Sequence, residues 1–163
     1  NSIFDPDYTG TGHQPLGHDQ WSVFYQQYSV VKSKITVHAA SFGNTSAANG
    51  ILSIKTIADD AAPGTTYNTT VLENPSTSWK VYGGNASSGP ITVTKTFNHK
   101  TTYKRPISDD TFISNFGYNP NEQTYFHVCN QALADTNDSA PLECVAIIEY
   151  YVMLRTPIEL NQS

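Results

Sequence analysis

Hydrophobic and polar residues alternate along several short stretches of the chain, and segments rich in Gly, Pro, Asn and Asp separate these stretches. Such alternation is typical of β-strands that have one face on a core, and the separating residues are typical of turns. In all we expect seven or eight strands and one short helix, which indicates an antiparallel β-sandwich in a single domain over residues 1–163. The clearest strands are predicted at Val30–Phe42, Ile51–Ile57, Trp79–Tyr82, Ile91–Phe97, Gln123–Cys129 and Cys144–Thr156.

The one helix is predicted near the N-terminus. Tyr8–Gly17 holds three glycines and a proline, a composition of turns rather than of a helix interior. Asp19 is then a suitable N-cap for a helix that runs through Tyr28. The aromatic residues of this stretch recur at helical spacing and are expected to pack against the sandwich as one stripe: Trp21, Phe24, Tyr25 and Tyr28.

The last predicted strand is hydrophobic on both faces. The face suited to a core holds Ala146, Ile148, Tyr150, Val152 and Leu154. The other face is also mostly apolar but carries Glu149 and Arg155, and charged groups are costly to bury without partners. This second face either meets another chain or is covered by loops of its own chain. If it meets another chain, the candidate contact residues are Tyr151, Met153 and Arg155.

Composition agrees with a β-protein. Val, Ile and Thr supply 40 of the 163 residues, against seven Leu and one Met. Residues branched at Cβ suit a pleated sheet and lose rotamer freedom in a helix, so a helical bundle is excluded. No apolar run approaches the roughly 20 residues that span a bilayer, so we expect no membrane partner.

The net charge of −5 conceals an uneven distribution. Residues 74–108 contain no Asp or Glu but five basic residues, whereas the rest of the chain holds four basic and fourteen acidic residues. This bias is either chance in a Thr- and Asn-rich region or a basic face directed at phosphate or at an acidic neighbouring subunit. The candidate nucleic-acid-binding residues are Lys95, Lys100, Lys104 and Arg105.

We expect no enzyme activity and no catalytic, metal or cofactor site. The acids and histidines near the N-terminus match no strong metal signature, and turns use such acids to bond backbone N–H groups. Asp59–Asp60 and Asp109–Asp110 are interpreted as solvated loop acids rather than as calcium ligands. Cys129 and Cys144 fall on opposite faces of their strands, so two free thiols are predicted.

Three stretches of the chain resemble capsid proteins of small circular Rep-encoding single-stranded DNA viruses (the CRESS-DNA or circovirus-like group). The opening NSIFDPDYTGTGHQPLGHDQWSVFYQQYSVVKSKITV is similar to the start of their jelly-roll domain, and IIEYYVMLRTPIELNQS is similar to their last strand and tail. Between them, ITVTKTFNHKTTYKR is similar to a strand followed by a basic loop. The residues that carry the first motif are Asp5, Pro6, Tyr8, Gly10, Gly12, His13, Gln14, Pro15, Gly17, Asp19 and Gln20.

The resemblance implies an eight-stranded jelly roll that assembles with itself into an icosahedral T=1 shell, with about 60 copies around a single-stranded DNA genome. It implies location in the virion, with assembly in the host nucleus or cytoplasm, and recognition of a host receptor. Such proteins usually begin with a basic arm. The first lysine here is Lys32, so we expect that arm upstream of Asn1.

Two other classes of protein are considered beside the capsid subunit. A secreted β-sandwich that binds a carbohydrate or a receptor would also explain the aromatic residues and the Thr- and Asn-rich loops. An enzyme on a jelly-roll scaffold would need a cluster of metal-binding histidines, and the sequence has no such motif.

Overall fold

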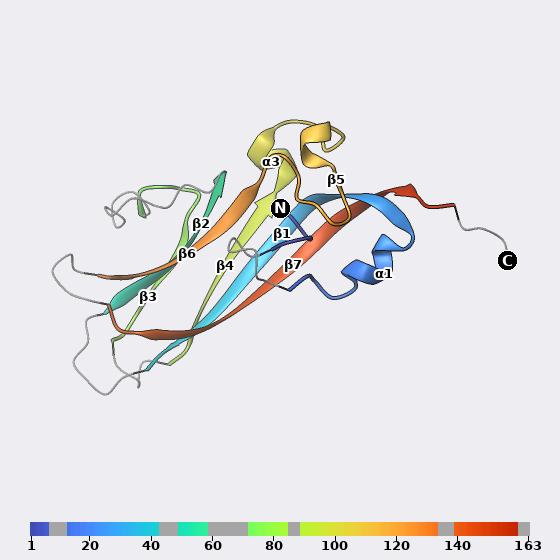
Figure 1. Ribbon diagram of the computed structural model, residues 1–163. Coiled ribbons are helices and arrows are strands. Elements are labelled where there is room, and N and C mark those ends of the chain that lie inside the picture. The colour runs from blue at the N-terminus through green and yellow to red at the C-terminus, as the bar shows by residue number, and fades with distance from the viewer. Residues whose placement is uncertain (7–12, 43–48, 59–71, 85–88, 134–138, 160–163) are drawn as a thin grey trace.

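The computed structural model describes residues 1–6, 13–42, 49–58, 72–84, 89–133 and 139–159, which form two antiparallel sheets (Figure 1). In the first sheet, the long strand β1 (Tyr25–Ser41) lies between β4 (Ile91–Asn98) and β7 (Leu142–Pro157), and the short β5 (Ser114–Asn115) pairs with the start of β1. In the second sheet, β2 (Gly50–Ala58) lies between β3 (Ser78–Tyr82) and β6 (Thr124–Ala132).

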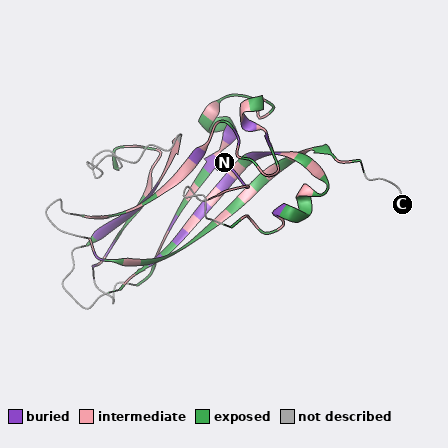
Figure 2. Ribbon diagram, in the orientation of Figure 1, coloured by how far each residue is buried: buried purple, intermediate pink, exposed green. Residues whose placement is uncertain are grey.

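The core lies between the inner faces of the two central strands. Ile35 and Val37 of β1 are 3% and 1% exposed, and Leu52 and Ile54 of β2 are 1% and 0% exposed. Burial of this kind contributes roughly 1.5–3 kcal/mol for each large aliphatic side chain. In Figure 2 the buried residues follow these central strands, while much of β7 is exposed.

A β-bulge in β1 determines which residues face inward. The pairing of β1 with β7 shifts register between Val30 and Lys32, and an extra residue of this kind reverses the alternation. As a result Tyr28 and Val30 face a smaller core cluster before the bulge, and Ile35 and Val37 face the main core after it.

Gly50 is required by its neighbour across the sheet. It pairs with Tyr82, and a Cβ atom at Gly50 would lie 2.3 Å from the Tyr82 ring. The hydroxyl oxygen of Tyr82 lies 2.9 Å from the Ala140 carbonyl oxygen and 2.6 Å from Asn130 Oδ1, within hydrogen-bonding distance of both, so the ring has little freedom to move. A side chain at position 50 would therefore displace a ring that belongs to the core.

The predicted antiparallel all-β sandwich with a short N-terminal helix is confirmed, and all six strands placed by alternation are present. The described residues hold seven strands, of which β5 has two residues. Two helical turns were not expected, α3 (His99–Tyr103) and the 3-10 turn η1 (Asp110–Phe112). Cys129 and Cys144 are both thiols that form no disulfide, as predicted. Within the described ranges, no helix is long and apolar enough to cross a membrane.

The prediction of a helix from Asp19 through Tyr28 is wrong in its extent. The helix α1 covers only His18–Ser22, and its N-cap is Gly17, with φ of +89°. The chain is extended from Tyr25 onward because β1 pairs there with the end of β7. The predicted aromatic stripe is therefore divided: Trp21 and Phe24 are exposed, whereas Tyr28 is fully buried in a strand.

Candidate functional site

The basic segment does not form one patch of four cations. Lys95 lies on β4 opposite Ile35, on the inner side of the sheet, and it is half-buried. Removal from water lowers the pKa of its amino group, since burial disfavours the charged form. Lys100 and Lys104, by contrast, lie at the α3 turn beyond the end of β4 and are exposed. The structure thus separates Lys95 from the other candidates.

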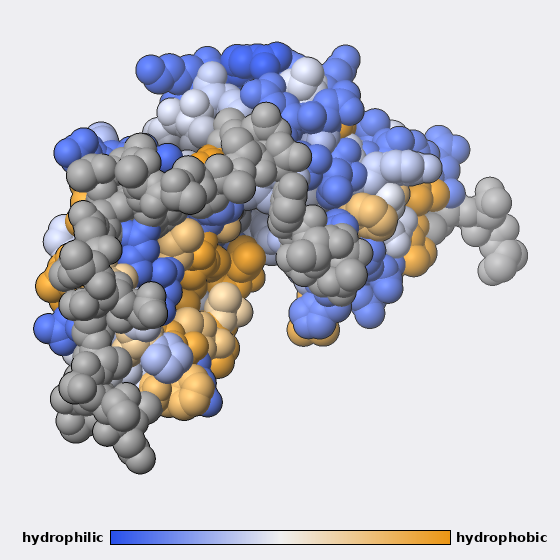
Figure 3. Space-filling view, turned by 60° about the vertical axis from the view of Figure 1, so that its left-hand side comes forward, coloured by the Kyte–Doolittle hydropathy of each residue, from blue (hydrophilic) through white to orange (hydrophobic). Residues whose placement is uncertain are grey.

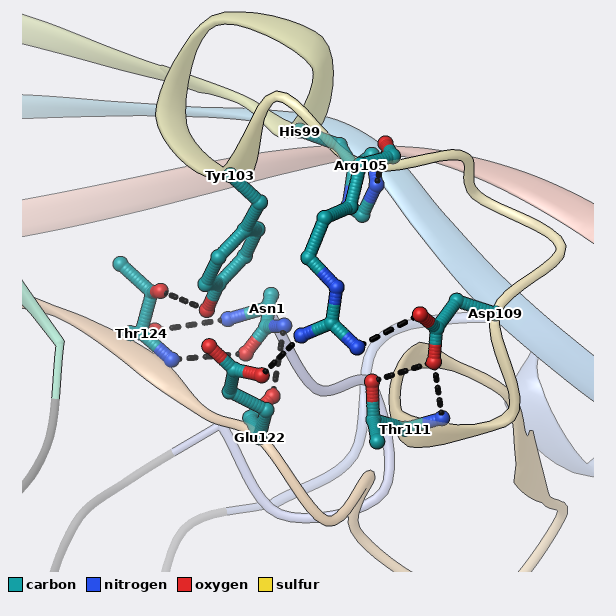
Figure 4. A network of polar contacts seen from close by, with 8 residues as sticks. All are labelled: Asn1, His99, Tyr103, Arg105, Asp109, Thr111, Glu122 and Thr124. Atoms are coloured by element: carbon teal, nitrogen blue, oxygen red, sulfur yellow. Dashed lines mark hydrogen bonds and ion pairs between the residues drawn. The ribbon is translucent and has the colours of Figure 1, made fainter.

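Arg105 is occupied by two carboxylates of its own chain. Its guanidinium donates to Asp109 at 2.5 Å and to Glu122 at 3.0 Å (Figure 4), and its Cζ lies 4.9 Å from the centroid of the Phe112 ring. An acidic neighbour was one of the two predicted targets of the basic segment, and here the acid belongs to the same chain. A guanidinium with two carboxylate partners has little charge left for phosphate.

The α3 turn is held in place by its own sequence. The Asn98 side chain accepts a hydrogen bond from the Lys100 amide at 3.0 Å, which is an N-cap, and Lys104 ends the turn in the left-handed region with φ of +55°. Sequence reasoning treated this stretch as a basic loop. The Asn-His-Lys start was the local signal for the cap, because Asn is among the preferred N-cap residues.

Tyr103 belongs to an aromatic cluster rather than to an exposed stacking surface. Its ring centroid is 4.5 Å from that of Phe112 and 5.4 Å from that of His99. Its hydroxyl bonds to the Thr124 side chain, and burial raises the pKa of the phenol (Figure 4). These contacts fix the base of α3 against the start of β6. Lys100 and Lys104 therefore belong to a turn that is held in place by packing against β6.

The outer face of β7 is an exposed apolar stripe. Its members are 42–63% exposed, and we call them the β7 stripe: Val145, Ile147, Tyr151 and Met153. The described residues leave these side chains exposed to solvent. Tyr151 and Met153 were predicted contact residues; Val145 and Ile147 share their face and extend the set.

The charge of Glu149 beside the β7 stripe is compensated within the chain, whereas that of Arg155 is not. Glu149 pairs with Lys34 across the sheet at 2.9 Å, and Lys32 Nζ lies 5.1 Å from the centroid of the Tyr151 ring. Arg155, the third predicted contact residue, is half-buried; its guanidinium donates to the Ile107 carbonyl oxygen at 3.3 Å, and its buried Nε has no hydrogen-bond partner among the described residues.

The N-terminal motif is described in part. Tyr8, Gly10 and Gly12 lie outside the described residues. His18, next to the motif residue Gly17, is buried; its Nδ1 lies 3.1 Å from Asp19 Oδ1 and its ring is 5.1 Å from the Phe116 ring. The remaining motif residues lie in the segments before and within α1: Asp5, Pro6, His13, Gln14, Pro15, Asp19 and Gln20.

No protein-family model matches the chain, and no curated protein matches it at a significant level. Among solved structures, one similar chain comes from Desmodium yellow mottle tymovirus. The two chains are 16% identical, the match covers 91% of this chain and 76% of that chain, and the TM-score is 0.42. The fold described above rests on this chain's own sheets.

Proposed function

We propose that this protein is the structural subunit of a small icosahedral viral shell that packages circular single-stranded DNA. The sequence resemblance described above supports this function, as does a β-sandwich with a face suited to contact between copies. The observation that carries the proposal is the exposed β7 stripe. On this proposal the protein is not an enzyme and its place is the virion.

The stripe has the properties of a subunit contact. Val145 and Met153 are eight residues apart on one strand, so the stripe is about 27 Å long. Glu149, which lies between Ile147 and Tyr151 on this face, forms an ion pair with Lys34, so the stripe has apolar side chains on either side of one ion pair. Exposed apolar patches are typical of interaction sites, and covering this one removes apolar surface from water without burying an unpaired carboxylate.

A shell also needs contacts to its genome, and these are proposed at α3. Lys100 and Lys104 are exposed there, and no ion pair is recorded for them among the described residues. Two cations for each subunit are few for condensing a genome, so on this proposal they supply only part of the neutralising charge. Closed T=1 symmetry would place about 60 copies of α3 on the inner surface.

The test makes the same substitution, Val to Asp, at two different positions. Val145→Asp puts a charge in the β7 stripe, whereas Val81→Asp puts the same charge on an equally apolar but separate strand, β3, where Val81 is 44% exposed. Both variants should fold, because both side chains are exposed. Particles should form with the unaltered chain and with Val81→Asp but not with Val145→Asp, as seen by negative-stain microscopy and analytical ultracentrifugation.

Two results would contradict the proposal. One is an unaltered chain that stays monomeric at high concentration, over a range of salt and with DNA present. The other is equal particle yield from Val145→Asp and Val81→Asp, which would show that assembly, if it occurs, does not use the β7 stripe.

A further inference from the structure

The strand β7 has a long open edge. It is the last strand of its sheet, because among the described strands it pairs only with β1 (Figure 1). It has 16 residues, whereas the other strands at the edges of the two sheets, β3, β4 and β6, have five, eight and nine. The N–H and C=O groups on the side of β7 away from β1 can therefore accept another strand.

This edge lacks the usual protection against pairing. Proteins commonly blunt an open edge with proline, lysine, a bulge or a charge that points inward. β7 has no proline or lysine between Pro141 and Pro157, and the bulge in its pairing with β1 lies in β1, between Val30 and Lys32. The charged side chains of β7 all lie on its outer face: Glu143, Glu149 and Arg155.

The apolar residues of β7 are self-complementary about Glu149. When two antiparallel copies of a strand are related by a two-fold axis through one residue, residues equally far from that residue face each other. With the axis at Glu149, Val145 lies opposite the partner's Met153. Ile147 lies opposite the partner's Tyr151. The β7 stripes of the two copies then form one apolar surface, and each exposed member gains an apolar cross-strand neighbour.

The same register joins two charges that have no ionic partner in their own chain. Glu143 is exposed, and Arg155 donates to the Ile107 carbonyl oxygen; neither is in an ion pair among the described residues. With the axis at Glu149, Glu143 of each copy lies opposite the partner's Arg155, so the pair of copies forms two ion pairs. An axis through either neighbouring residue would place both charges opposite uncharged side chains.

Glu149 faces its own copy at the axis in this register. Two carboxylates directly opposite each other repel. Each of them, however, is already paired with Lys34 of its own chain at 2.9 Å. The axis then holds two carboxylates and two ammonium groups, with no net charge, so Glu149 does not exclude the register.

The inner face of β7 also gains contacts. Ile148, which is only partly buried, lies opposite the partner's Tyr150 in this register, and both residue types line a groove of about 390 Å³ beside β6. Figure 3 shows apolar residues gathered around a hollow of the molecule. Pairing of two edges would continue this apolar lining from one copy to the next.

We propose that two copies of this chain pair through their β7 edges, antiparallel and about a two-fold axis at Glu149, so that their sheets join into one. The inference rests on the association of copies proposed above, and it names the contact at one kind of symmetry axis. An icosahedral shell has two-fold axes that such a pair can occupy, but the pair itself does not require a shell.

Disulfide cross-linking tests the register, in a chain of residues 1–163 whose own Cys129 and Cys144 are replaced by serine. Glu149→Cys brings two thiols together at the axis, with Cα atoms about 4.5–5.5 Å apart, a distance that a disulfide spans. Tyr151→Cys is the matched control, because its two thiols are offset by four residues, about 13 Å along the strand. Mild oxidation should cross-link Glu149→Cys into dimers and leave Tyr151→Cys uncross-linked.

Charge reversal tests the two ion pairs. Glu143→Arg and Arg155→Glu each put like charges opposite each other in a pair of identical copies, so each should raise the dissociation constant of the dimer by roughly tenfold in analytical ultracentrifugation. An equimolar mixture of the two variants should dimerise about as well as the unaltered chain, because the mixed dimer restores both ion pairs. Recovery on mixing also shows that both variants are folded.

Several results would overturn the inference: equal cross-linking of Glu149→Cys and Tyr151→Cys, no cross-linking of either, or no recovery on mixing of two variants that keep the unfolding midpoint of the unaltered chain. The outcome is separable from that of the shell. Particles whose Glu149→Cys chains do not cross-link would retain the shell and overturn the β7 pairing. A cross-linked dimer that never forms particles would retain the β7 pairing and contradict the shell.

Discussion

Single charged side chains in this protein differ mainly in the partners that the fold brings to them. Lys100 and Arg105 look alike in the sequence, as members of one acid-free basic segment. In the structure Arg105 bonds to Asp109 and Glu122, which are four and seventeen residues away, whereas Lys100 is exposed. Sequence alone could assign the sign of these charges but not their partners, because Glu122 reaches Arg105 only after β6 has been placed.

The carboxyl group of Asp109 provides a test of this local network. Hydrogen bonds from the side chain and amide of Thr111, and then from Arg105, lower the pKa of Asp109. The folded state therefore holds this proton less tightly than the unfolded state. The resulting stability is present above the unfolded pKa of about 3.9 and is lost as the pH falls through the lower, folded value.

Thr111→Val should raise the pKa of Asp109 toward its ordinary value, and by more than Arg105→Gln does, because the Thr111 side chain is the largest cause of the shift. Carboxyl carbon NMR titration measures both values directly. Acid unfolding of the Thr111→Val variant should also begin at a higher pH. A larger shift in Arg105→Gln would show that the ion pair, and not the threonine, controls this carboxyl group.

Strands were predictable here where turns were not. Alternation over seven residues identified β2 and β4 closely, since a period of two needs no knowledge of the partner strand. The start of β1 was missed because aromatic residues at Trp21 and Phe24 also fit a helical period. That segment is extended because it pairs with the end of β7, which lies more than 100 residues later in the chain. The order of the strands in each sheet likewise depends on pairing between distant segments, so alternation within one segment does not predict it.

Nucleic-acid binding by this chain should reflect the elements that present the cations. Each phosphate neutralised on a single strand contributes a slope of about −0.7 to the salt dependence of binding, so Lys100 and Lys104 together predict about −1.4, against about −2.8 for all four candidates. Titration of a fluorescent oligonucleotide at several salt concentrations measures this slope for residues 1–163.

Substitutions at the four positions separate the two cases. Lys100→Gln with Lys104→Gln should remove most of the slope, whereas Arg105→Gln should leave it nearly unchanged, because Arg105 is already paired. If Arg105→Gln lowers the slope as much as either lysine substitution does, the ion pairs open on binding and the four residues act as one patch.

The molecule has two apolar surfaces on opposite faces of β7. The inner face of β7 and the neighbouring strand β6 line a groove with Ile148 and Val128, whereas the β7 stripe lies on the outer face. The two-faced apolarity of Cys144–Thr156 was visible in the sequence, but only the structure shows that residues on the outer face are exposed and that residues on the inner face are partly buried.

Salt should distinguish the two kinds of contact that a shell of this protein would use. The β7 stripe is apolar and Glu149 within it is already paired with Lys34, so raising NaCl from about 0.1 M to about 1 M, where the screening length falls to about 3 Å, should leave subunit contacts intact. The same change should release nucleic acid bound through Lys100 and Lys104, because that attraction depends on counterion release. Light scattering follows the particles, and the ratio of absorbance at 260 and 280 nm follows their nucleic acid. Empty but intact particles at high salt are the expected outcome; particles that dissociate together with release of DNA would show that the β7 stripe is not the contact that holds the shell.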